Sequence, residues 1–429
     1  MSFPQKCTKS SMVAVCLQIP LRKSVKKDRE GIVMRNPVYL LWLDEINSES
    51  LAFLPSLSKL RSQGVDLSLK PLPLVEKGQC YYQTLTGMGP GKLGRFDKVR
   101  TEAYSVYANT GVPDGAWGCM LSDILHAYEL AITSLEVTNR DDLNVLADGP
   151  FHFAQVHLLG AGQLPLSELD EIVQRFLELV PATAHILVLT DVWSPVSTAL
   201  VNVNDFLKDR GFLEMDEPCC HASIIWNKTI AYGVGTGQIW VNLRGREPQG
   251  IVNPGNEYRE VCDALIDELC TRWLDQQTKE PVIEQVLKKD EIYTGEYLFR
   301  APDLVTIYRS GYAASAKAAM LDFDGRSVNP VKVPMRTERL ADPYARLIAN
   351  GPCLVNGLRR WARLIDIVPN VLYLLGLPIP QRIDGKVIAD LFTQSYYART
   401  PLQFIDDSKL SHEEEGLIVD RLRDLGYLE

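Results

Sequence analysis

The chain has 429 residues, of which 46% are hydrophobic and 23% charged, a composition typical of a soluble globular protein with one large α/β domain or two domains. Its formal net charge of −9 argues against a nucleic-acid-binding surface, and the absence of about 18 consecutive apolar residues argues against a membrane span. The cysteine count is nine, an odd number that fits a reducing compartment better than a disulfide framework. We therefore expect a cytoplasmic protein.

The first part of the chain predicts an extension followed by a buried strand. Residues 1–34 lack periodicity and predict a flexible extension, and their apolar stretch precedes a basic cluster, the reverse of the order in a secretory signal. The apolar run at 38–43 predicts a strand that Asp44 closes. Leucines at helical spacing follow, and Gly64 predicts the end of that helix.

The next elements repeat the pattern of a helix followed by a strand. Ser167 and Asp170 resemble a capping box, and an apolar helical face follows them. The run at 186–189 predicts a second buried strand, closed by Asp191. A short helix at 204–210 should then end at Gly211.

This alternation predicts an α/β fold with a mostly parallel central sheet and helices on both faces. The segment 216–300 changes character, with turn-rich strands and one long amphipathic helix, and is predicted to be an inserted smaller subdomain. The core is expected to span 35–215 and 301–400. A strand at 304–308 is expected to bring the chain back into the core after the inserted subdomain. Residues 401–429 are predicted to form a tail with a terminal helix.

Two carboxylates occupy positions where chemistry gathers in such folds. Functional groups collect at the carboxyl ends of strands in open α/β sheets, and Asp44 and Asp191 each follow a predicted strand. Carboxylates there suit hard or borderline divalent cations. The alternative is that each residue caps the helix after it.

Six segments of the chain carry short motifs in a fixed order. They are Thr86-Gly87 with Pro90-Gly91-Lys92, Gly94 and Phe96-Asp97; Thr190-Asp191 with Pro195; residues 201–213; residues 239–252; residues 365–380 with Asp384-Gly385; and residues 421–429. Together they resemble the type I phosphodiesterase and nucleotide pyrophosphatase family of the alkaline phosphatase superfamily, over about residues 36–429. The resemblance implies an alkaline-phosphatase-like α/β sandwich. In active members it also implies two metal ions held by Asp and His, and a Thr or Ser nucleophile at a helix N-terminus.

Most of the groups that this resemblance implies are replaced in this chain. Lys77 stands at the nucleophile position, and Val192 stands where a histidine is expected after Asp191. The segment 156–166 lacks the expected acid, and no histidine lies between His221 and His412 to supply the last ligand. A catalytic zinc normally has at least three protein ligands. We expect Asp44 and Asp191 to be remnant metal ligands without a metal.

Several other residues leave alternatives open. Cys80 is a candidate nucleophile near a helix N-terminus, or simply a small buried residue. His152 and His157 alternate with apolar residues, so His157 could face the cleft, or either could be a satisfied core or edge histidine.

The basic residues of this region carry two predictions. Lys77 with Lys92 or Arg95 could bind an anion where a phosphate would sit, or could be a solvated charge. Lys77 could also form an ion pair with Asp44 and Asp191 in place of a metal.

The sequence favours a non-catalytic pseudoenzyme: a binding, scaffolding or regulatory subunit that acts through another protein and needs no cofactor. A phosphate-containing ligand remains open. The alternative is a metal-dependent phosphodiesterase or phosphatase with a rebuilt site, using Cys80, a water, or one zinc or manganese ion on Asp44 and Asp191. A third hypothesis is a structural partner in a larger assembly that docks through residues 216–300 or the basic N-terminus.

Overall fold

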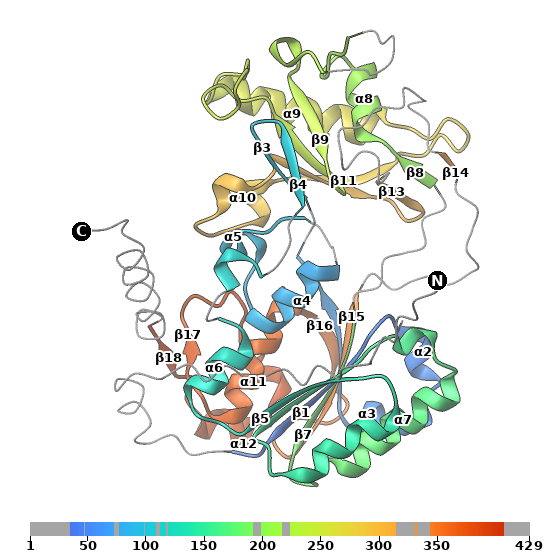
Figure 1. Cartoon of the computed structure of the whole chain (residues 1–429), viewed down its shortest axis with the longest axis vertical. Coiled ribbons are helices and arrows are strands. Elements are labelled where there is room, and N and C mark those ends of the chain that lie inside the picture. Colours follow the sequence, from blue (N-terminus) through green and yellow to red (C-terminus); the bar gives the residue numbers. More distant parts are fainter. Residues whose placement is uncertain are drawn as a thin grey trace, which may run out of the picture.

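The computed structural model describes residues 35–46, 48–72, 77–97, 99–108, 112–116, 119–191, 199–216, 224–314, 331–332 and 344–406. The predicted extension at 1–34 and the predicted terminal helix lie outside these residues. Figure 1 shows two units: a larger one built around a long sheet, and a smaller one placed at one end of it.

The larger unit contains a seven-stranded sheet in the order β16-β2-β15-β7-β1-β6-β5. Every neighbouring pair is parallel except the two that involve β15, which runs against both β2 and β7. The strands are β1 (Val38–Leu43), β2 (Val65–Lys70), β5 (Ile132–Val137), β6 (Phe153–Leu158), β7 (His185–Thr190), β15 (Ala345–Asn350) and β16 (Arg359–Arg363). The prediction of a mostly parallel α/β sheet is confirmed.

Helices cover both faces of this sheet, because its central strands are apolar on both sides (Figure 1). One face packs against α2 (Ser48–Ala52), α3 (Pro55–Gln63) and α7 (Leu166–Leu179). The other packs against α4 (Lys77–Thr86), α6 (Leu121–Ala127) and α11 (Ile367–Leu375). Alternate residues of β1 belong to the two apolar clusters, as the two-residue period of a strand requires.

The helix boundaries confirm two of the predicted stops and correct one start. Helix α3 ends directly before Gly64, and α8 (Val203–Asp209) ends two residues before Gly211. The capping box expected at Ser167 and Asp170 is wrong, since no side chain caps α7. The Asp170 carboxylate instead accepts the amide of Ser56 at 3.0 Å, in the first turn of α3. It therefore stabilises the start of a neighbouring helix.

The smaller unit is a four-stranded antiparallel sheet in the order β11-β12-β10-β9, with α8 and α9 (Asn256–Arg272) packed on it (Figure 1). Its strands are β9 (Ala231–Val234), β10 (Gln238–Val241), β11 (Ile283–Lys288) and β12 (Leu304–Tyr308). Strand β12 is the run that we expected to return the chain to the core, and it pairs instead with β10 and β11. A short apolar run does not specify which of two sheets it joins.

Shorter elements complete the described structure. The strands are β3 (Val99–Glu102) with β4 (Ser105–Ala108), β8 (Ala199–Val201) with β13 (Tyr312–Ala314) and β14 (Val331–Lys332), and β17 (Ile379–Pro380) with β18 (Phe404–Ile405). The short helices are α5 (Pro90–Leu93), α10 (Lys289–Ile292) and α12 (Gln394–Arg399). The hairpin of β3 and β4 lies beside the smaller unit, although it precedes the rest of that unit by several elements in the sequence (Figure 1).

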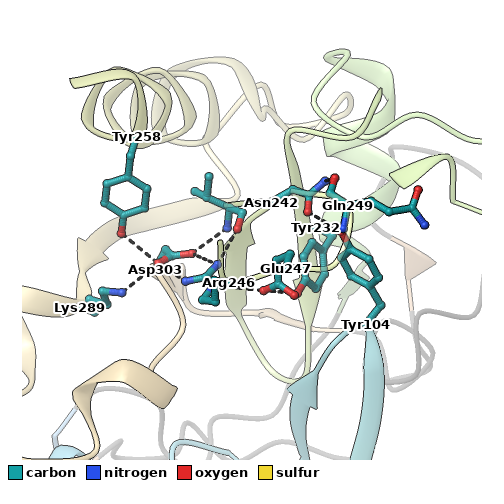
Figure 2. A network of polar contacts seen from close by, with 10 residues as sticks. Tyr104, Tyr232, Asn242, Arg246, Glu247, Gln249, Tyr258, Lys289 and Asp303 are labelled. Atoms are coloured by element: carbon teal, nitrogen blue, oxygen red, sulfur yellow. Dashed lines mark hydrogen bonds and ion pairs between the residues drawn. The ribbon is translucent and has the colours of Figure 1, made fainter. Parts of the chain in front are cut away.

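A buried carboxylate, Asp303, organises the smaller unit (Figure 2). Its side chain is 0% exposed and accepts two N–H donors of Arg246, at 2.9 and 2.7 Å. Lys289 Nζ (3.0 Å), the Tyr258 hydroxyl (2.9 Å) and the Val241 amide (2.8 Å) also donate to it.

The donors around Asp303 keep it ionised. Burial by itself would raise the pKa of Asp303, but the hydrogen bonds and charge of Arg246 and the charge of Lys289 outweigh burial and lower it. One carboxylate therefore ties together β10, the start of β12, α9 and α10.

We expect Asp303→Asn to destabilise the protein by about 3 kcal/mol, because the Arg246 guanidinium would remain buried without its carboxylate. Urea denaturation measures the change. The matched control is Asp263→Asn, since Asp263 pairs with Lys288 at 2.6 Å but its side chain is 66% exposed. That variant should cost less than about 1 kcal/mol. Equal losses in the two variants would contradict a special role for the buried carboxylate.

Candidate functional site

The parallel register of β1 and β7 brings Asp44 and Asp191 together. Leu43 lies opposite Thr190 in this pair of strands, so the residue after each strand emerges at the same edge of the sheet. The Asp191 amide donates to the Leu43 carbonyl at 3.4 Å, which extends the ladder by one residue. The two carboxyl groups lie close enough for Asp44 to raise the pKa of Asp191.

Trp42 contributes a side-chain donor to this pair. Its indole N–H donates to Asp191 Oδ1 at 2.5 Å. Trp42 and Asp44 are two residues apart at the end of β1, a spacing that directs side chains to the same face of a sheet. This spacing in the sequence could have indicated that Trp42 lies beside the acids. A search for metal ligands alone does not detect it.

Glu45 contributes a backbone donor. Its amide donates to Asp191 Oδ2 at 3.3 Å, and its φ is +57°. A left-handed conformation is strained for a residue other than glycine. The strain at Glu45 therefore accompanies an amide directed at the acidic pair, and no sequence pattern indicated it.

The contact between the two acids changes their protonation. Burial and the hydrogen bond with Asp44 raise the pKa of Asp191 to about 7, while the hydrogen bond from Trp42 opposes this rise. Asp191 therefore keeps its proton to a higher pH than an isolated aspartate does.

Aromatic rings border the acidic pair. His157 lies opposite Trp42 in the register of β1 and β6, and their ring centroids are 5.3 Å apart. Tyr81 of α4 stacks on Trp42 with a centroid distance of 5.5 Å. His152 lies before β6, where its Nδ1 accepts the Ala131 amide at 3.0 Å. His157 is thus the histidine beside the site, whereas His152 makes a structural hydrogen bond.

Lys77, which occupies the nucleophile position, and Cys80, the candidate nucleophile, lie in the first turn of α4. Lys77 begins this helix, but its side chain is outside what the structure describes, so its ion pair with the two acids remains a prediction. Val192 and Pro195 also lie outside the described residues. Cys80 is 5% exposed and belongs to the apolar cluster on the α4 face of the sheet.

Two basic side chains considered for anion binding contact other protein groups. Lys92 Nζ lies 2.7 Å from Asp384 Oδ1 and donates to the Arg382 carbonyl at 2.6 Å. The Arg95 guanidinium lies 5.6 Å from the centre of the Tyr82 ring. Anion binding by these residues stays a prediction, and an anion would compete with Asp384 for Lys92.

The motif at 90–92 lies where the two units meet. A Cβ at Gly91 would come within 2.4 Å of the Thr294 carbonyl oxygen. Asp97, a few residues later in the same segment, accepts the amide and the hydroxyl of Thr236 at 2.7 and 2.8 Å. The motif thus forms a contact between the larger and the smaller unit.

We expect the raised pKa of Asp191 to make the free energy of unfolding depend on pH. The pKa of Asp191 rises from 3.8 to about 7 on folding, so its stabilising contribution is complete below pH 3.8 and is lost as the pH rises toward 7. Asp191→Asn stays neutral at every pH, so its stability relative to the wild type should increase between about pH 4 and 7 and level off at higher pH. The increase should be on the order of 2 kcal/mol, because solvent screens part of the full effect at a partly exposed carboxyl group. Urea denaturation at several pH values measures this difference.

The control for this prediction is Thr190→Val, which alters the neighbouring residue without removing a titrating group. Its stability should differ from the wild type by the same amount at every pH. Parallel curves for the wild type and Asp191→Asn would show that folding does not raise the pKa of Asp191.

The comparisons with known proteins find similarity only among solved structures. No protein-family model matches the chain, and no curated protein matches it. The chain is similar to a structure of murine ectonucleotide pyrophosphatase/phosphodiesterase 5, with 12% identity and a TM-score of 0.48 over 83% of this chain and 100% of that chain. It is also similar to an inactive variant of that murine protein in complex with AMP, with 11% identity and a TM-score of 0.47 over the same shares. In the described ranges, every helix is too short or too polar to span a lipid bilayer.

Proposed function

We propose that this chain is a non-catalytic protein on a phosphodiesterase-type α/β frame: a binding, scaffolding or regulatory subunit whose two-metal site is degraded. The frame is supported by the order of its sequence motifs and by the mostly parallel sheet with helices on both faces. The loss of catalysis is supported by the surroundings of the two remaining acids.

The close approach of Asp44 and Asp191, which the register of β1 and β7 brings to one edge of the sheet, carries this proposal. A metal ion binds the ionised form of a carboxylate, so the raised pKa of Asp191 opposes metal binding. The donors to Asp191 act in the same direction, because the Trp42 N–H donates to Oδ1 and the Glu45 amide donates to Oδ2.

The donor set does not fit a pair of metal ions. Asp44 Oδ2 accepts the Gly160 amide at 3.3 Å, so three of the four carboxyl oxygens already accept an N–H donor. Among the described residues, no three His, Cys, Asp or Glu side chains group as metal ligands would. A catalytic zinc needs about three protein ligands per ion.

The second candidate is a metal-dependent phosphodiesterase or phosphatase with a rebuilt site. The observation in its favour is the contact between two carboxyl groups at the carboxyl ends of parallel strands. Asp44 and Asp191, once ionised, could hold one zinc or manganese ion, whose chemistry would be to polarise a phosphate oxygen or a water. His157 would then border the substrate.

The cellular setting follows from composition and is part of the same proposal. The odd number of nine cysteines supports a reducing compartment, so we infer a cytoplasmic location. A non-catalytic subunit would act on another protein, so we infer a protein partner as well. A phosphate-containing ligand would be held by Lys77 with Lys92 or Arg95.

Hydrolysis of bis-p-nitrophenyl phosphate tests the choice between these functions. We expect the purified full-length chain, supplied with Zn²⁺ or Mn²⁺, to show no turnover above that of the double variant Asp44→Ala/Asp191→Ala. Turnover that depends on the metal and is lost in the double variant would overturn the proposal and support the rebuilt enzyme.

Thermal unfolding with added Mn²⁺ gives a second measurement without turnover. A free ion at about 1,000 times its dissociation constant stabilises a protein by about 4 kcal/mol, which raises the unfolding temperature by several degrees. We expect Mn²⁺ to leave the unfolding temperature of the wild type unchanged, as in Asp44→Asn. A rise in the wild type that Asp44→Asn lacks would indicate an ion on the acidic pair and would contradict the degraded site.

A further inference from the structure

The hairpin of β3 and β4 has a strained turn at its tip. Glu102 pairs with Ser105, so Ala103 and Tyr104 are the two central residues of the turn. Both have positive φ, +48° and +69°. Turns of this kind normally carry Asn-Gly or similar pairs, because a side chain with a Cβ is strained there. Ala-Tyr is an unfavourable pair for this turn, so the local sequence does not explain its conformation.

The contacts of Tyr104 explain why the strain is tolerated (Figure 2). The Tyr104 ring stacks on Trp226 with a centroid distance of 3.7 Å and an interplanar angle of 8°. The Tyr104 hydroxyl donates to Asn242 Oδ1 at 2.7 Å and accepts the Gln249 amide at 3.0 Å. Trp226, Asn242 and Gln249 all belong to segments that flank β9 and β10 of the smaller unit.

The seat that receives Tyr104, formed by Trp226, Asn242 and Tyr232, is held by the smaller unit itself. Asn242 is fully buried, and its side-chain amide donates to the carbonyls of Trp226 and Thr229 at 2.8 and 2.9 Å. Tyr232, also fully buried, lies edge-on to both Trp226 and Tyr104. The acceptor and the ring that hold Tyr104 are therefore positioned by contacts within the smaller unit.

The hairpin follows the segment of the larger unit that contains Gly91 and Asp97. Its contacts with the seat thus add to the Gly91–Thr294 approach and the Asp97–Thr236 hydrogen bonds described above. The hairpin differs from those contacts in one respect. Its turn keeps two residues in a strained conformation while the Tyr104 ring is docked, which the other contacts do not.

We propose that the β3–β4 hairpin is a strained latch, which fastens the smaller unit to the segment leading out of the larger unit and opens on its own before either sheet unfolds. Strain raises the free energy of the docked form. The difference in free energy between the docked and open forms is therefore smaller than the contacts alone would make it. Opening separates Tyr104 from Trp226 and breaks its hydrogen bonds with Asn242 and Gln249. The latch operates whether or not the acidic pair binds a metal.

Hydrogen exchange of the full-length chain tests the latch. Tyr104→Phe keeps the ring in its seat but removes both hydrogen bonds, leaving the Asn242 oxygen and the Gln249 amide without that partner. We expect the amides of the hairpin and of Gln249 to exchange on the order of 10-fold faster in this variant. The amides of β1 and β7 should exchange at the wild-type rate.

A second variant changes the strain and leaves the seat intact. Asn tolerates the left-handed conformation better than Ala, so Ala103→Asn should stabilise the docked form. Exchange of the hairpin amides should slow several-fold in Ala103→Asn, opposite to the change in Tyr104→Phe. The matched control is Tyr397→Phe, which removes a tyrosine hydroxyl from the larger unit and should leave hairpin exchange unchanged.

Three results would overturn the proposal. In the first, hairpin exchange is the same in Tyr104→Phe as in the wild type, so the hydroxyl does not hold the latch. In the second, exchange in β1 and β7 rises in step with the hairpin, so the hairpin opens only with global unfolding. In the third, Ala103→Asn does not slow hairpin exchange, so strain at the turn does not set the opening.

Discussion

The position of β1 between β6 and β7, with both pairs parallel and in register, is the constraint on which the candidate site depends. Leu43 lies opposite Leu158 on one side and Thr190 on the other, so the chain leaves all three strands at one level. A shift of one residue in either pairing would turn the side chains at these strand ends to the opposite face of the sheet. The acidic pair, its Trp42 donor and the neighbouring His157 are consequences of this register.

A second constraint is the contact between the two units. The segment 90–97 contacts the smaller unit at Thr294 and Thr236, and the hairpin after it reaches Trp226. Residues that resembled a family motif in the sequence therefore connect the larger unit to the smaller one. Glycine is required at position 91 because the Thr294 carbonyl leaves no space for a Cβ.

Much of the larger unit was predictable, because buried parallel strands are continuous apolar runs and their helices have clear apolar faces. The bounds expected for β1 and the end of α3 agree with the structure for this reason, and in the smaller unit α8 ends before Gly211 as expected. The errors involve partners that are distant in sequence. Asp170 stabilises α3 instead of its own helix, and Leu304–Tyr308 joins the smaller sheet, since neither choice is encoded in the adjacent residues.

The order of residues was enough to establish that two acids follow two apolar strands and that the histidine expected after Asp191 is replaced, because residue identity and strand ends are local properties. The contacts of these acids came from the tertiary structure alone. The raised pKa of Asp191 and the hydrogen bonds that it accepts from the Trp42 indole and the Glu45 amide depend on where separate segments meet. A carboxylate's protonation is set by the burial and the donors around it, and three-dimensional packing supplies both.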